Sequence, residues 1–126
     1  FVTKEHLTQY EPFVAALAEH TAAYGKPVLL LEGDSHIYRS DNPLSQTAPC
    51  AGETDPATSA SVCAHDPGNS AWNSHPSYDV ANFHRVVVHG STTPLEWLKL
   101  TLDPGADHPA TDTTFGPFSW QRMIQN

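Results

Sequence analysis

An uninterrupted apolar run, Val28–Leu31, stops at Glu32 and Gly33 and constrains the fold of this chain more than any other feature. A short continuous apolar run predicts a strand that is buried on both faces, as in the centre of a parallel sheet. Asp34 and His36 follow the run and would stand at the strand's carboxyl end, where open α/β sheets bind ligands. The pattern therefore predicts a central strand that carries two potential ligands, with a solvated structural turn as the alternative.

A helix is predicted to precede this strand. Pro12 suits a first helical turn, where its missing N–H is not needed. Val14 and Leu17 then recur at helical spacing, and Gly25 supplies the stop. A separate short helical turn is expected over residues 3–10. Helix and strand together predict an α/β unit.

Charge and length limit the classes of function. The 126 residues fit one domain or a domain fragment, and 14 Asp and Glu against 6 Lys and Arg give a formal net charge of -8. No basic surface for nucleic acid is expected, and no apolar stretch is long enough to span a membrane. An anionic substrate would therefore have to be attracted locally, for example by a bound metal ion.

The two cysteines lie in a long segment with little apolar periodicity, residues 45–79. A structureless stretch of this length inside a compact domain is often functional. Free thiols in a polar loop would be prone to oxidation, so a disulfide between Cys50 and Cys63 is the favoured interpretation, and two unpaired thiols are the alternative. Such a bond would add about 3 kcal/mol of stability and indicates a secreted or periplasmic protein.

Two runs rich in strand-forming residues follow, 83–89 and 95–102, with the turn-like residues 90–94 between them. Two such runs joined by a short turn predict an antiparallel β-hairpin near the C-terminus. The tail after Ala106 is polar at first, but four later residues indicate that its end packs on an apolar surface: Phe115, Phe118, Trp120 and Met123.

Several residues that could bind a ligand or take part in catalysis have simpler interpretations. His84 and His89 flank a valine run and are predicted to be surface or strand-edge residues. Arg39 lies near enough to His36 to contact a phosphate, but a surface arginine is the favoured prediction. Trp97 is predicted to serve packing rather than ligand stacking.

Five strings in this order resemble the C-terminal part of bacterial calcineurin-like metallophosphoesterases: residues 26–36, with Gly33-Asp34-Ser35-His36, then residues 42–44, 82–86, 90–92 and 97–104. The resemblance implies an α/β chain that is the C-terminal portion of an α/β/β/α sandwich. One main helix, a buried strand, a long disulfide-stapled loop and a C-terminal β-hairpin would be its elements.

The family's last ligand motif is Gly-His-x-His, so the resemblance implies that His36 is a metal ligand and that Asp34 replaces the other histidine. Asp34 would then bind metal or orient a ligand histidine. Two divalent ions (Mn, Fe or Zn) are expected in the complete enzyme, which would hydrolyse phosphate esters. The family's Gly-Asp-x-x-Asp and Gly-Asn-His motifs do not occur here. Asp34-Ser35-His36 also spells the family's first motif, Asp-x-His, but nothing downstream continues that alternative. The chain is therefore expected to be a C-terminal segment whose partner is the upstream remainder of the same enzyme.

Two alternatives stay open. Gly33-Asp34-Ser35 is similar to the nucleophile block of a GDSL-type esterase, with Ser35 as nucleophile and a histidine such as His75 or His108 as base. A non-catalytic exported module for binding or assembly is compatible with the acidic, Ser-, Thr- and Pro-rich composition.

Overall fold

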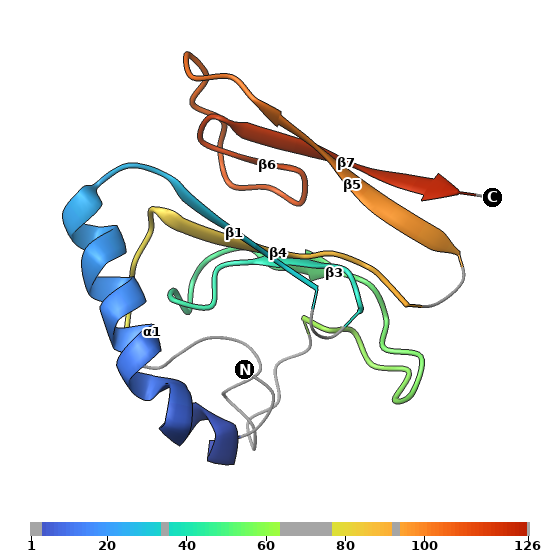
Figure 1. The fold of residues 1–126 in the computed structure, drawn as a ribbon, viewed down its shortest axis with the longest axis horizontal. Helices are drawn as coiled ribbons and strands as arrows, with labels where there is room; N and C mark the ends of the chain where they lie inside the picture. Colours follow the sequence, from blue (N-terminus) through green and yellow to red (C-terminus); the bar gives the residue numbers. More distant parts are fainter. Residues whose placement is uncertain (1–3, 34–35, 64–76, 92–93, 126) are drawn as a thin grey trace.

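The computed structural model describes residues 4–33, 36–63, 77–91 and 94–125, and these form one helix and seven strands (Figure 1). None of the described helices combines the length and hydropathy that a membrane crossing requires. In chain order the elements are α1 (Lys4–Tyr24), β1 (Val28–Glu32), β2 (Arg39–Asp41), β3 (Ala51–Gly52), β4 (Phe83–Val87), β5 (Leu95–Leu102), β6 (Thr114–Phe115) and β7 (Phe118–Gln125).

Helix α1 is continuous through Pro12, so the predicted separate turn over residues 3–10 is wrong. A proline removes one helical hydrogen bond, and the turns on both sides of it continue the helix here. Val14, Ala18 and Thr21 form its buried face. Gly25 ends the helix as predicted: its φ is +68°, and its N–H donates to the Thr21 carbonyl at 3.2 Å.

The first sheet has the order β1-β4-β2-β3. β1 and β4 run parallel, with Val28 opposite Phe83 and Glu32 opposite Val87. Among the described strands β1 therefore lies at an end of this sheet, and the prediction of a central, fully buried strand is wrong. Leu31 is 43% exposed, because β4 is the one described strand beside β1.

The second sheet has the order β5-β7-β6. β5 pairs antiparallel with β7 along its whole length, from Leu95 opposite Gln125 to Leu102 opposite Phe118. The predicted hairpin between 83–89 and 95–102 is therefore wrong. Both edges of β4 are taken by β1 and β2, so β5 turns away and finds its partner in the C-terminal tail.

Two apolar clusters hold the layers together. One joins α1 to the first sheet and includes Val14, Ala18 and Phe83. The other lies between the two sheets and contains Tyr38, Val86, Phe115 and Trp120. Figure 1 shows the β5–β7 layer lying over the β1–β4 layer. The tail therefore packs on an apolar surface, as the sequence predicts, and the described chain is a mixed α/β structure with two sheets.

The cysteine-bearing segment is stapled as predicted by a Cys50–Cys63 disulfide. Thr54 and Ser61 form an isolated antiparallel bridge inside this ring. A side chain at Gly52 would place its Cβ 2.8 Å from the Tyr38 carbonyl oxygen, so this position needs glycine for the close approach of β3 to β2. The disulfide is compatible with an extracellular or otherwise oxidising compartment.

Candidate functional site

His36 lies just beyond the carboxyl end of β1, and its side chain is exposed. Its backbone is in the left-handed region, with φ +59°, and its carbonyl accepts a hydrogen bond from the Gly90 N–H at 3.2 Å. Its Nδ1 lies 3.4 Å from the point that a Cβ on Gly90 would occupy. Asp34 and Ser35, the other predicted site residues of this segment, lie outside the described residues.

The parallel pairing of β1 and β4 brings their carboxyl ends to one edge. The Val88 N–H donates to the Glu32 carbonyl at 2.7 Å, so the chain after β4 runs beside the chain after β1. His89 and Gly90 therefore lie next to the His36 segment. The predicted hairpin does not bring His89 close to His36, because it pairs β4 with an antiparallel strand. Recognising β4 as a second parallel strand beside β1 would have predicted this proximity.

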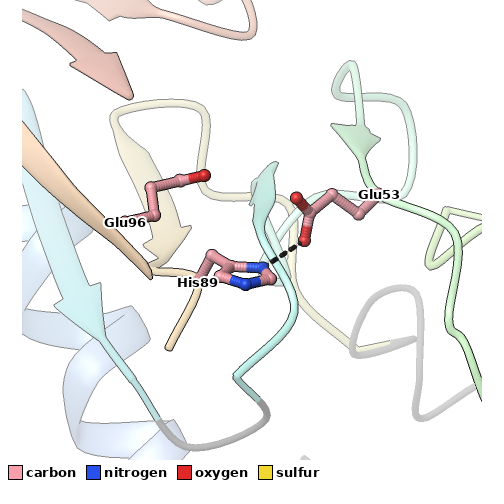
Figure 2. A group of neighbouring side chains, drawn as sticks. All are labelled: Glu53, His89 and Glu96. Carbon is pink, nitrogen blue, oxygen red and sulfur yellow. Dashed lines mark hydrogen bonds and ion pairs between the residues drawn. The ribbon is translucent and has the colours of Figure 1, made fainter. Parts of the chain in front are cut away.

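A group of possible metal donors lies at the same edge: Glu53, His89 and Glu96 (Figure 2). One donor atom from each lies within 4.8 Å of the others. His89 Nδ1 and Glu53 Oε2 are 2.8 Å apart, and the Tyr38 N–H also donates to that oxygen at 3.0 Å. The three residues come from three separate segments: the one after β3, the one after β4, and β5 itself.

Arg122, on β7, already neutralises this group. Its Nε and Nη2 donate to the two oxygens of Glu96 at 2.6 and 2.7 Å, and Nη2 also binds Glu53. The hydrogen bond to Glu96 is the main cause that raises the pKa of Arg122 above its usual value. The guanidinium lies 4.2 Å from the ring centre of Tyr38. A metal ion here would have to displace Arg122, so the group is best explained as an ion-pair clasp between the two sheets.

The pKa of Glu53 reflects the same contacts. Partial burial acts to raise it, but the hydrogen bonds from His89, the Tyr38 N–H and Arg122 outweigh burial, so the pKa lies below its usual value. Glu53 is therefore ionised at neutral pH and bridges the segment after β3 to β7.

A second polar network, which the sequence did not predict, lies inside the first sheet. Asp41 accepts from Arg85 Nε at 2.9 Å, from Arg85 Nη2 at 2.8 Å and from Arg39 Nε at 2.6 Å. Glu32 adds a contact to Arg85 at 3.3 Å. Arg39 is buried, so its predicted surface position is wrong; burial in the middle of the sheet lowers its pKa.

His84 is also buried, at 2% exposure, which overturns its predicted surface or strand-edge position. β4 is covered by α1 on one face and by the second sheet on the other, so even its polar side chains lie inside. His84 Nε2 is 2.8 Å from Ser40 Oγ, and the ring stacks on Phe115 at 5.2 Å. Burial lowers the pKa of His84 from 6.5 to about 4, so it is neutral at pH 7. Both partners are buried, so the Ser40–His84 pair is closed to solvent.

The remaining predicted residues take varied positions. His89 is half-buried and bound to Glu53 instead of lying free on the surface. Trp97 leaves 54% of its surface exposed, so its predicted packing role involves less than half of the side chain. His108 is exposed, in a bridge with Gly116, and His75 lies outside the described residues.

Comparisons with known proteins leave the family open. Neither the family models, nor the curated proteins, nor the solved structures contain a match to this chain. A functional assignment therefore depends on the residues and the geometry described above.

Proposed function

We propose that this chain is part of a metal-dependent phosphoesterase and that His36 is one of its metal ligands. The observation that carries the proposal is the parallel pairing of β1 and β4, which brings His36 and His89 to the same carboxyl edge. Enzymes with parallel strands commonly bind their ligands at this edge. The resemblance of residues 26–36, 42–44, 82–86, 90–92 and 97–104 to metallophosphoesterases supports the same assignment.

The available donors fit a divalent cation. The exposed imidazole of His36 is a suitable ligand for Mn, Fe or Zn, and the carboxylate of Asp34 can bind the ion or orient another ligand. When bound, two such ions would supply a clamp for the phosphate ester and an activated hydroxide. With a net charge of -8, the protein itself offers little attraction for an anionic ester, so a local positive charge is needed.

The open edge of β1 supports the proposal that the other ligands come from elsewhere in the same enzyme. Strands in parallel sheets usually have both faces covered, and the unbroken apolar composition of Val28–Leu31 suits such a position. Yet Leu31 is 43% exposed and β1 pairs with β4 alone among the described strands. An upstream segment that adds a strand to β1 would cover these residues and bring the missing aspartate and histidine ligands. We also propose a secreted or periplasmic location, in keeping with the disulfide.

Metal binding tests the proposal without relying on activity. The chain joined to its upstream segment is dialysed against Mn²⁺ or Zn²⁺, and the bound metal is measured by elemental mass spectrometry and by titration calorimetry. His36→Ala should weaken binding about tenfold or more, because it removes a direct ligand. His20→Ala, at an exposed histidine of α1, is the matched control and should change nothing.

Two results would contradict the proposal. Metal binding that is unchanged in His36→Ala would remove the ligand role. Covalent labelling of Ser35 by a serine-directed phosphonate, without bound metal, would support the GDSL-type esterase instead. In the enzyme joined to its upstream segment, hydrolysis of a phosphodiester should fall with the same variant.

A further inference from the structure

β5 is an end strand whose outer edge has no partner among the described residues. It is eight residues long and pairs with β7 on one side alone. Its apolar side chains are unusually exposed: Leu95, Trp97, Leu100 and Leu102. A long, apolar, open edge strand is a template for pairing with another strand, and proteins usually protect it with several charges, a proline or a bulge.

The charges around β5 do not give that protection. Its carboxylate, Glu96, points toward the first sheet, is almost completely buried and is paired with Arg122. Lys99 is then the one exposed charge of the strand. On the outer face the paired positions of β7 are uncharged: Ser119, Gln121, Met123 and Gln125. Although the protein is strongly acidic overall, this face has no carboxylate in either strand that could repel a second copy.

We propose that β5 pairs antiparallel with β5 of a second copy of this chain, centred on Leu98. This register places Trp97 opposite the partner's Lys99, twice across the two-fold axis. An ammonium group over an indole ring is a favourable contact. A register centred on Lys99 would instead place two lysines opposite each other, which is destabilising. The strand is therefore complementary to itself, and pairing joins the two three-stranded sheets into one continuous sheet.

Cross-linking between copies tests both the pairing and the register. Leu95 lies opposite the partner's Thr101 in this arrangement, and side chains at such positions are close enough for a disulfide. The variants Leu95→Cys and Thr101→Cys are made separately in the full chain, with the Cys50–Cys63 bond intact. A mixture of the two should form a covalent dimer under mild oxidation, well above the level that either variant forms alone. A mixture that gives no more dimer than the single variants overturns the proposal.

Mass measurement by light scattering after size-exclusion chromatography tests the role of the lysine. The unmodified protein should show a concentration-dependent shift from monomer to dimer. Lys99→Glu should raise the dimer dissociation constant about tenfold, because two cation–π contacts are lost. Lys26→Glu makes the same change of charge at an exposed site near the end of α1 and should leave the constant unchanged. A protein that is monomeric at all concentrations, or a constant that responds equally to both variants, overturns the proposal.

Discussion

β4 and β5 show how weakly the composition of a strand decides its burial. β4 has the sequence Phe-His-Arg-Val-Val and is buried at all five positions. β5 contains three further leucines besides Leu95, and most of its positions are exposed. Among the described strands, β4 lies between two others and between two layers, whereas β5 has a single neighbour. The position of a strand in the sheet therefore decides its burial more than the hydrophobicity of its residues does.

The polar residues of β4 are tolerated because each has a specific partner. Arg85 is held by Asp41 and Glu32, and His84 lies beside Ser40. Burial acts to lower the pKa of Arg85, but the interaction with Asp41 outweighs it and the pKa is raised. A buried charge is costly unless it is paired and hydrogen-bonded. Changing these partners therefore tests the difference between β4 and β5.

The largest effect is expected from Asp41→Ala. This change leaves two buried arginines without their shared carboxylate and should lower the free energy of unfolding by about 3–5 kcal/mol. Urea denaturation followed by circular dichroism measures it. Asp41→Asn keeps the shape of the side chain and one acceptor, so it should lower the free energy of unfolding by less. It can be measured even if the alanine variant does not fold.

Asp107→Ala is the control for that experiment, because Asp107 is exposed. It should change the free energy of unfolding by less than about 0.5 kcal/mol. Equal effects of Asp41→Ala and Asp107→Ala would show that the buried network does not stabilise the first sheet.

Lowering the pH is expected to have an intermediate effect on the free energy of unfolding. The pKa of His84 is about 4 in the folded chain, against 6.5 for a histidine side chain in water. Below pH 6.5 the unfolded chain gains a proton that the folded chain does not take up, so stability falls until about pH 4 and this contribution is then constant. The loss from this group is roughly 3 kcal/mol.

Urea midpoints measured between pH 8 and pH 4 test this prediction. His84→Gln, which has no titrating ring, should flatten the dependence in this range. The lowered pKa of Glu53 acts in the same direction, but its contribution is lost below the ordinary value of 4.5, so it adds little to the pH dependence in this range. A pH dependence that His84→Gln leaves unchanged would assign the acid sensitivity to other groups.

The smallest effect is expected on β5. Leu102→Thr removes an apolar side chain that is 59% exposed and should cost less than about 0.5 kcal/mol. Val86→Thr on β4 has nearly the same shape as the original residue but buries a new hydroxyl and should cost about 1–3 kcal/mol. Thermal unfolding of both variants at a protein concentration that keeps them monomeric compares the two strands directly. Equal losses of stability in Leu102→Thr and Val86→Thr would contradict the proposed difference between β5 and β4.

Local signals in the sequence predict local features well. The helical spacing of Val14 and Leu17, the stop at Gly25, the strand after Pro27 and the Cys50–Cys63 bond each depend on neighbouring residues or on simple chemistry, and all are present. The sequence also predicts His36 as a metal ligand; it lies just beyond the carboxyl end of β1, and its ligand role stays a prediction.

Pairing between distant segments is not predictable in the same way. The turn-like residues 90–94 suggest a hairpin, but nothing local shows that β4 already has two partners or that β7 forms from the tail. The buried positions of Arg39 and His84 follow from those pairings. The ion-pair clasp cannot be predicted from the sequence for the same reason, because its members come from separate segments: Glu53, His89, Glu96 and Arg122.

The parallel pairing of Val28 with Phe83 also has a consequence for folding kinetics. The chain must close a loop that contains the whole cysteine-bearing segment before β1 gains β4, its one neighbour among the described strands. By contrast, α1 and the β5–β7 pair form over shorter spans. Assembly of the first sheet should therefore be the slow step of refolding. During that interval the unbroken leucines of β1 are open to solvent, and this is the stage at which the nascent protein is most prone to aggregate.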